Sequence, residues 1–127
     1  MLNRFNKNIM KQEEKELLIK DLCGRLPYGT MVYAQNAVDW YDSEICTQVL
    51  SDVINEDYVV KPYLFPMSSM TDEQEMECQQ IKHSYYYDDD SFVLFDWYNK
   101  NHIDYRGLIN KGLAIDATGL NIYKILN

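Results

Sequence analysis

Cysteine is scarce in this sequence, and the three cysteines stand far apart without a Cys-x-x-Cys pair. Disulfide-rich secreted domains use an even number of cysteines, and structural zinc sites use ligands paired at short spacing. Cys78 and His83 approach such a pair, but no second pair answers them. We therefore expect reduced thiols with no disulfide framework, no metal site and no cofactor, a pattern typical of an intracellular protein.

Long apolar runs are also missing. The longest fall far short of the roughly 20 residues that a membrane-spanning helix needs. The opening residues 1–7 are not followed by the apolar core of a secretory signal. We expect a protein that stays in the cytoplasm of the cell that makes it and has no membrane partner.

Basic residues are rare in the middle of the chain, where residues 39–96 hold fourteen acidic side chains and only two lysines, Lys61 and Lys82. The whole chain has a net charge of −8. A strongly acidic segment repels phosphate backbones, so we expect no direct nucleic-acid binding. Such a segment can present a negative surface to a basic partner, although acidity also serves solubility alone.

Common catalytic motifs are absent: there is no Gly-x-Ser-x-Gly elbow, His-Glu-x-x-His pair, phosphate-cradling loop or dinucleotide fingerprint. One cluster has the residue types of acid–base chemistry, namely His102, Asp104, Tyr105 and Arg106. It lacks a neighbouring nucleophile. The same residues fit a structural interpretation in which the guanidinium of Arg106 forks onto a carboxylate, Asp104 caps a short turn and Tyr105 packs. We expect a protein that is not an enzyme.

Tyrosine is abundant, with eleven residues, and two Trp-Tyr pairs accompany it. Trp and Tyr supply large apolar area with a polar tip, so they suit both cores and binding surfaces. Trp97-Tyr98 lies on a predicted apolar helix face, where we expect Trp97 in the core. Trp40-Tyr41 lies in a predicted connection between acidic residues, where Trp40 is the better candidate for an exposed partner anchor. An equally weighted alternative is that Trp40 packs over the end of a small barrel.

The run Asp88-Asp89-Asp90 could bind a hard cation through its carboxylates. Calcium loops, however, space their ligands at alternate positions and need a glycine for the turn, so a solvated loop before a helix fits the run better. The candidate binding residues of the whole chain are Trp40, Tyr41, Asp88, Asp89, Asp90, His102, Asp104, Tyr105 and Arg106.

The first half of the chain is predicted to contain a helix followed by strands. Apolar residues recur on one face of a helix over residues 11–24, with a glycine at its end. Residues 30–34 have the composition of a strand, and residues 36–43 that of a connection or hairpin. Residues 44–50 alternate like a second strand but fit one helical face equally well, so both alternatives stay open.

The stretch 60–76 joins the two halves of the chain. A strand is expected to end at Pro62, and Pro62 and Pro66 keep the residues before them extended. Thr71 and the three residues after it fit the reciprocal capping box of a helix start. The acids in that first turn complement the positive end of the helix dipole.

The C-terminal third is predicted to hold a helix from Ser91, a short helical turn over 104–112 closed by glycine, and a hairpin over 113–123. Together the segments predict one α+β domain over residues 1–127. Its parts are an N-terminal helix, a small antiparallel sheet or partly open barrel, two further helices and a short C-terminal hairpin. Residues 1–10 are expected to form a loose arm.

Several blocks of the chain are distinctive in composition and order, and they are Lys61-Pro62-Tyr63-Leu64, Pro66-Met67-Ser68-Ser69-Met70-Thr71, Phe95-Asp96-Trp97, Asp104-Tyr105-Arg106-Gly107-Leu108-Ile109 and Lys111-Gly112-Leu113-Ala114. On these blocks the chain resembles a group of small, uncharacterised proteins encoded by phages and mobile elements of gut bacteria. The resemblance implies a genetic setting in a bacterial host. It carries no established activity.

Composition and resemblance favour a non-enzymatic binding or regulatory protein that acts on a host macromolecule, most directly a host protein, through its acidic and tyrosine-rich surface. A narrower variant, an inhibitor that imitates nucleic-acid charge, requires the acids of residues 39–96 to form one contiguous face. A second hypothesis is a small enzyme or ligand-sequestering protein with a pocket lined by Tyr85 to Tyr87, His102 and Arg106. A third is a self-assembling structural component with a homo-oligomeric interface.

Overall fold

The structure is a computed structural model that describes residues 10–56, 58–84 and 91–123. These residues form four α-helices and five strands of an α+β fold, which confirms the predicted class. The sheet is open and mixed, rather than a barrel or a purely antiparallel sheet. The elements are α1 (Gln12–Arg25), η1 (Leu26–Tyr28), β1 (Met31–Gln35), β2 (Trp40–Glu44), α2 (Thr47–Glu56), β3 (Val60–Pro66), η2 (Met67–Ser69), α3 (Asp72–Ser84), α4 (Ser91–Lys100), β4 (Ile103–Asp104) and β5 (Ile115–Asp116), where η denotes a 3₁₀ turn.

β3 is the strand around which the sheet is organised. Its first half pairs with β1 in antiparallel register, with Val32 opposite Pro62, and β1 pairs in turn with β2. Its second half pairs in parallel with the two-residue strands β4 and β5, for example with Phe65 opposite Ile103. Parallel neighbours need a long connection, and α3 and α4 provide it between β3 and β4.

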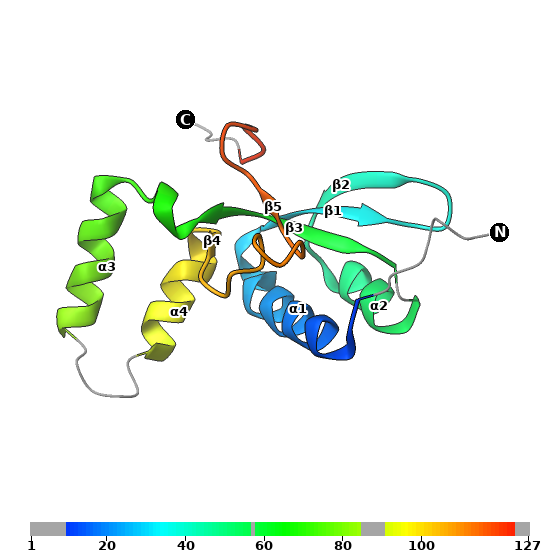
Figure 1. The fold of residues 1–127 in the computed structure, drawn as a ribbon, viewed down its shortest axis with the longest axis horizontal. Coiled ribbons are helices and arrows are strands. Elements are labelled where there is room, and N and C mark those ends of the chain that lie inside the picture. Colours follow the sequence, from blue (N-terminus) through cyan, green and yellow to red (C-terminus); the bar gives the residue numbers. More distant parts are fainter. Residues whose placement is uncertain (1–9, 57, 85–90, 124–127) are drawn as a thin grey trace.

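One face of the sheet is covered by α1 and α2, whereas no helix of the described residues lies over the other face of β1 and β2 (Figure 1). Side chains alternate between the two faces along a strand. Val32 and Ala34 therefore point into the core beneath the sheet, and Met31 and Tyr33 point away from it. The buried aliphatic core between the layers consists of Leu18, Leu22, Val32, Ala34, Ile45, Val49, Val53, Val60, Leu64, Leu108, Leu113 and Ala114.

α3 and α4 form a helical hairpin at the opposite end of the long axis from the β1–β2 turn (Figure 1). A second hydrophobic cluster lies there, with Cys78, Tyr98 and Ile103 as its buried members. The predicted capping box of α3 is confirmed. Gln74 N–H donates to Thr71 Oγ1 at 3.1 Å, and Thr71 N–H donates to Gln74 Oε1 at 3.0 Å.

The structure decides between the strand and the helix that the sequence left open for residues 44–50. Residues 47–56 form α2, so the strand alternative for residues 44–50 is wrong and the helical alternative is right. Val49 and Val53 lie one turn apart and are both buried, which explains why this face forms a helix against the core. The strand lies earlier, at β2, which pairs with β1, so the hairpin alternative for residues 36–43 is right and the connection alternative is wrong.

β3 runs through both prolines to Pro66, whereas we predicted a strand that ends at Pro62. Gln35 N–H donates to Val59 O at 2.9 Å, so Val59 turns its polar groups toward β1. Successive residues of a strand turn their polar groups to opposite edges, so Lys61 also faces β1 and Pro62 faces away. The missing N–H of Pro62 therefore breaks no bond to β1, which is why the strand tolerates it.

Three further boundaries differ from the prediction or lie outside the description. The hairpin predicted over 113–123 is not formed within the described residues, because Ile115–Asp116 pair in parallel with β3 and a turn follows them. α1 continues through Gly24, its predicted end, to Arg25. The glycine that adopts a left-handed conformation is Gly29, after the 3₁₀ turn η1, with φ +66°. Residues 1–9 of the predicted arm lie outside the described residues.

Candidate functional site

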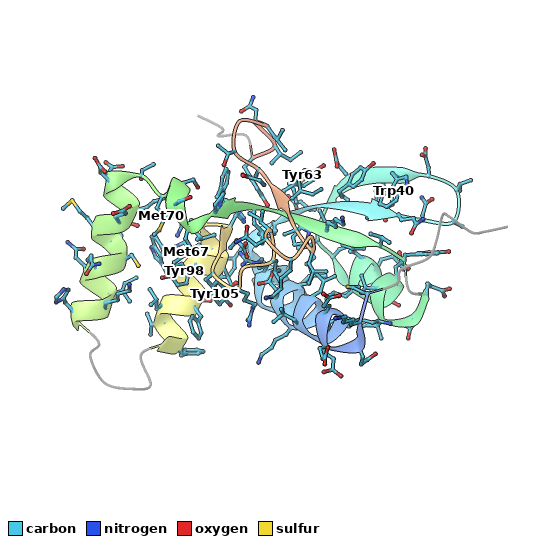
Figure 2. The ribbon with its side chains drawn as sticks, in the orientation of Figure 1. Trp40, Tyr63, Met67, Met70, Tyr98 and Tyr105 are labelled. Carbon is cyan, nitrogen blue, oxygen red and sulfur yellow. The ribbon has the colours of Figure 1, made fainter. Side chains whose placement is uncertain are left out.

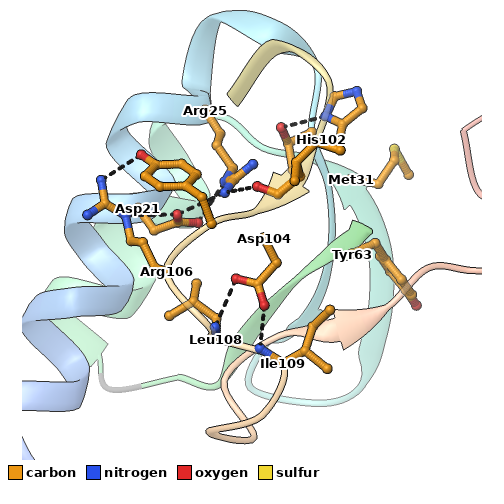
Figure 3. Close-up of polar contacts among 12 residues, drawn as sticks. Asp21, Arg25, Met31, Tyr63, His102, Asp104, Arg106, Leu108 and Ile109 are labelled. Carbon is orange, nitrogen blue, oxygen red and sulfur yellow. Dashed lines mark hydrogen bonds and ion pairs between the residues drawn. The ribbon is translucent and has the colours of Figure 1, made fainter. Parts of the chain in front are cut away.

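The predicted cluster around Arg106 lies beside a buried ion pair of α1 (Figure 3). Arg25 Nε donates to Asp21 Oδ2 at 2.7 Å, and neither side chain has exposed area. Arg106 Nε donates to Asp21 Oδ1 at 3.1 Å from 85 residues along the chain. One buried carboxylate thus holds two guanidinium groups, and Arg25 Nη2 also donates to Ile103 O at 2.8 Å. The sequence pattern did not predict this network.

Tyr105 is enclosed by guanidinium groups and rings. Arg106 Nη2 donates to Tyr105 Oη at 2.9 Å, and the guanidinium carbons of Arg106 and Arg25 lie 4.8 and 5.5 Å from the ring centre. The rings of Tyr98 and Phe95 stack on Tyr105 with centre distances of 5.1 and 5.0 Å. Both the hydroxyl and the ring of Tyr105 are therefore engaged inside the protein, as the structural interpretation predicted.

Asp104 is buried, and its two carboxylate oxygens accept backbone hydrogen bonds from Leu108 N–H at 2.8 Å and Ile109 N–H at 2.9 Å. It caps the turn that follows β4, which confirms the structural interpretation of Asp104. Arg106 binds a carboxylate as predicted, but through Nε alone and not as a fork, because its Nη2 donates to Tyr105. A general base needs reach to the proton of a substrate. Both carboxylate oxygens of Asp104 instead accept hydrogen bonds from the backbone of its own chain.

His102 turns toward β1, away from Arg106. Its Nδ1 shares a hydrogen bond of 3.1 Å with Thr30 Oγ1, and its ring stacks on that of Tyr123 with a centre distance of 4.0 Å. Burial, with a smaller contribution from the Arg25 charge, lowers the pKa of His102 to about 4. The imidazole is therefore neutral at pH 7, and it contributes stacking rather than charge.

Tyr123 joins β1 to β3. Its hydroxyl accepts a hydrogen bond from Met31 N–H at 2.8 Å and donates one to Tyr63 O at 2.7 Å. Burial raises the pKa of Tyr123 above its ordinary value. The stack of His102 on this ring therefore supports a link between two strands.

The predicted pocket required His102 and Arg106 to converge. His102 contacts β1 and the C-terminal segment, whereas Arg106 contacts α1, and Figure 3 shows them on opposite sides of the cluster. His102 and Arg106 therefore do not line one common pocket. The other predicted lining residues, Tyr85 to Tyr87, lie outside the described residues, as do Asp88, Asp89 and Asp90.

The neighbouring residues Trp40 and Tyr41 point to opposite faces of the sheet. Tyr41 packs against the aliphatic core. Trp40 is 40% exposed, and its ring stacks on that of Tyr33 with centres 4.8 Å apart and planes inclined by 12°. Figure 2 shows Trp40 at the β1–β2 end of the molecule, far from Tyr98 and Tyr105. Trp40 opens β2, so its predicted place in a connection is wrong.

The turn between β1 and β2 is held by its own side chains. Asn36 Oδ1 accepts hydrogen bonds from Val38 N–H at 2.8 Å and Asp39 N–H at 2.7 Å. Asp39 Oδ1 accepts one from Trp40 N–H at 2.8 Å. Asn and Asp side chains that bond nearby N–H groups are a turn signal, so the Asn36-x-x-Asp39 spacing could have located this hairpin.

A hollow of about 390 Å³ lies at this end of the molecule. It is lined by the turn residues 35–39, by Trp40 and by Tyr58. Val38, at the tip of the turn, is 87% exposed. An exposed aromatic ring and an exposed apolar tip therefore lie beside a hollow at this end of the molecule.

The described acidic residues of the middle of the chain lie on the β1–β2 hairpin, on α2, on α3 and on α4, and the hairpin and α3 groups lie at opposite ends of the long axis (Figure 1). Asp42 and Glu44 lie on the same face of β2 as Trp40, and Asp39 precedes them at the turn. The second group lies on α3, within residues 72–77. The described acids therefore do not form the single contiguous face that the charge-imitating inhibitor requires.

The carboxylate of Asp42 is held by the sheet. Tyr63 Oη donates to Asp42 Oδ1 at 2.7 Å, and burial together with this bond raises the pKa of Tyr63 to about 12. Lys61 lies on the same face, opposite Tyr33 in the neighbouring strand. We call the set Tyr33, Asp39, Trp40, Asp42 and Glu44 the hairpin face.

The described residues contain no group of three or more His, Cys, Asp or Glu residues that could hold a metal ion. No helix among them is both long enough and apolar enough to cross a membrane. Comparison with protein-family models, with curated proteins and with solved structures finds no match to this chain.

Proposed function

We propose that this protein is a non-enzymatic binding protein that captures a basic segment of a partner protein on the hairpin face. The observation that carries the proposal is Trp40, which is 40% exposed although it belongs to a regular strand and stacks on Tyr33. Three carboxylates adjoin it on the same hairpin. Trp, Tyr and Arg dominate the energetics of protein interfaces, so a Trp ring bordered by acids suits an Arg- or Lys-bearing partner.

The physical advantage of this face is its preorganisation. The ring of Trp40 is already held against Tyr33, and the turn beside it is fixed by Asn36 and Asp39. Less side-chain freedom is therefore lost when a partner binds. A cation over an aromatic ring contributes about 0.5 to 2 kcal/mol, depending on how far it is desolvated.

The same observations weigh against the other hypotheses. The acid–base residues around Asp104 and Arg106 are engaged in structural contacts, which leaves the enzyme hypothesis without a site among the described residues. The negative hairpin face repels phosphates, which argues against direct nucleic-acid binding. Our proposal extends to a host protein in the bacterial cytoplasm as the partner, and the support for that setting is the sequence resemblance alone.

A matched pair of triple variants tests the proposal. Each variant removes three negative charges, and the two variants are Asp39→Asn/Asp42→Asn/Glu44→Gln on the hairpin face and Asp72→Asn/Glu73→Gln/Glu75→Gln on α3. The probe is a fluorescent peptide of about seven residues that alternates Arg and Thr, the length of a short strand. A peptide with Glu in place of Arg is the control probe, and binding is measured by fluorescence anisotropy.

We expect the basic peptide to bind the wild-type protein at about 50 mM salt and to weaken at about 500 mM. The hairpin variant should lose at least about tenfold in affinity, and the α3 variant should stay within about threefold of wild type. Equal losses in the two variants, or equal binding of the acidic peptide, would contradict the proposal.

A further inference from the structure

We infer that the partner segment binds as an added strand along the free edge of β2, with basic side chains at alternate positions. This inference rests on the proposed function, since it states how the hairpin face engages its partner. β2 ends the strand order β2-β1-β3-β4 of the described sheet, so its outer edge has no neighbouring strand among the described residues. An extended peptide can complete such an edge with main-chain hydrogen bonds.

The hydrogen bonds to β1 show which residues of β2 face outward. Asn36 N–H donates to Asp39 O at 2.9 Å, and Ile45 N–H donates to Thr30 O at 2.8 Å. Both residues that face β1 at the two ends of the strand, Asp39 and Ile45, have odd numbers. In an antiparallel pair, successive residues turn their polar groups to opposite edges, so the even residues 40, 42 and 44 face outward.

Only part of this outer edge is satisfied by the chain itself. Trp40 N–H donates to the side chain of Asp39, and Ser43 Oγ donates to Glu44 O at 2.8 Å. For Trp40 O, for both main-chain groups of Asp42 and for Glu44 N–H, the described residues provide no hydrogen-bond partner. These four groups span the length of a short strand, and two of them are acceptors and two are donors.

The side chains of the same three residues select the partner sequence. A residue directly opposite Asp42 or Glu44 in an added strand would project its side chain on the same face as those carboxylates. Lys or Arg at alternate positions of the partner therefore meets Asp42 and Glu44. The next alternate position meets the exposed ring of Trp40, which favours Arg because its planar guanidinium stacks on aromatic faces.

A second copy of this chain is a poorer occupant of the same edge. In an antiparallel pairing of β2 with β2 centred on Asp42, two Asp42 carboxylates would lie opposite each other. Like charges directly opposite in a sheet are destabilising. Charged side chains on edge strands also protect natural sheets against self-pairing. The acids of β2 therefore exclude a copy of β2 while they attract a basic strand.

Backbone methylation of the peptide probe separates strand addition from simple charge attraction. The alternating Arg-Thr peptide is made in two methylated forms, one with N-methyl groups on the Arg amides and the other with N-methyl groups on the Thr amides. We place the added strand antiparallel to β2. Residues opposite the outward positions of β2 then use their amides for pairing, and in this register these are the Arg residues. Both forms keep the full charge of the peptide.

We expect N-methylation of the Arg residues to weaken binding at least tenfold, and N-methylation of the Thr residues to leave the affinity within threefold. Equal binding by both forms, still lost in Trp40→Ala, would overturn strand addition and leave the binding function of the hairpin face intact. Absence of binding by the unmodified peptide would overturn both.

A pair of protein variants makes the same test from the other side. Glu44→Pro removes the outward N–H and the charge, whereas Glu44→Gln removes only the charge. Proline is tolerated on edge strands where its missing N–H faces away from the partner, so we expect both variants to fold. Glu44→Pro should bind the unmodified peptide at least tenfold more weakly than Glu44→Gln. Equal affinities in two folded variants would contradict strand addition, and the methylated peptides decide the matter if Glu44→Pro does not fold.

Discussion

The cluster around Asp104 and the hairpin face contain the same kinds of residue, but they use them in opposite ways. In the cluster, Asp21 and Arg25 have no exposed side-chain area, and the cationic, anionic and aromatic groups contact one another. On the hairpin face, the Trp40 ring is 40% exposed and the carboxylates beside it are exposed to solvent. The comparison shows that charged and aromatic residues indicate a binding site only where the fold leaves their groups available.

The buried cluster is also more costly to disturb. Removal of a buried carboxylate that neutralises two guanidinium groups leaves their positive charge uncompensated. Within the described residues, Arg25 Nη1 and Asn99 Oδ1 are buried without a hydrogen-bond partner. Arg25 therefore depends on its bonds to Asp21 and Ile103 to satisfy its charge. Variants in the cluster should therefore change stability, and variants on the hairpin face should change binding.

The largest expected effect is that of Asp21→Ala. Loss of this carboxylate leaves two guanidinium groups without their anion, and we expect the free energy of unfolding to fall by about 3 to 5 kcal/mol. Urea denaturation measures the change. Glu13→Ala, at an exposed site of the same helix, is the control and should cost less than about 1 kcal/mol. A similar, small loss in both variants would break the contrast between the two regions.

Asp104→Ala should have the next largest effect. Leu108 N–H and Ile109 N–H lose their acceptor, and Leu108 is fully buried, so we expect a loss of about 2 kcal/mol. Asp104→Asn keeps one acceptor oxygen and should lose less. Thermal and urea unfolding of both variants give the comparison. An Asp104→Ala protein as stable as wild type would show that this carboxylate is not structural.

A smaller effect is expected from the pH dependence of His102. Its pKa is about 4 in the folded protein and about 6.5 when unfolded, so the unfolded chain binds the proton first as pH falls. His102 therefore lowers the free energy of unfolding as pH falls. The loss is absent above pH 6.5, grows between pH 6.5 and about 4, and is complete below about 4. After allowance for partial exposure, we expect about 1 to 2 kcal/mol.

His102→Asn is the matched control for this titration. The residue has φ +59°, a conformation that Asn adopts more readily than most residues, and Asn does not titrate. The difference in unfolding free energy between wild type and variant, measured across this pH range, isolates His102 from the carboxylates that titrate with it. A difference that does not change with pH would contradict a buried neutral imidazole.

The smallest effect on stability is expected at Trp40, although its effect on binding should be large. Trp40→Ala should lower the free energy of unfolding by less than about 1 kcal/mol, whereas its neighbour Tyr41→Ala, which packs against the core, should cost about 2 kcal/mol. Affinity for the basic peptide should fall at least about tenfold in Trp40→Ala. Similar unfolding midpoints for the two variants would contradict their placement on opposite faces.

Local signals in the sequence predicted much of this fold. The 3.6-residue periodicity predicted α1, the capping box at Thr71 predicted the start of α3, and Ser91 was the expected start of α4. The structural roles of Asp104 and Arg106 were also predicted, because a carboxylate before a turn and a guanidinium have few ways to be satisfied when buried.

The rest depends on contacts between distant segments. No local pattern indicates the ion pair of Asp21 with Arg106, because Arg106 lies 85 residues away along the chain. β4 and β5 have two residues each, which is too few to show the alternating pattern of a strand. They are strands because their main chains pair with β3. The acidic neighbours of Trp40 indicate an exposed anchor, but its stacking on Tyr33 depends on the pairing of β2 with β1 and has no local signal.

Amide mapping by NMR tests the central contrast most directly. The ¹⁵N-labelled protein is titrated with the unmodified basic peptide, and shifts and hydrogen exchange are followed for every resolved amide. Our account predicts the largest shifts and new exchange protection at Asp42 and Glu44, with the amides of residues 102–106 unchanged. Largest changes at residues 102–106 or along α3, with β2 unaffected, would contradict it.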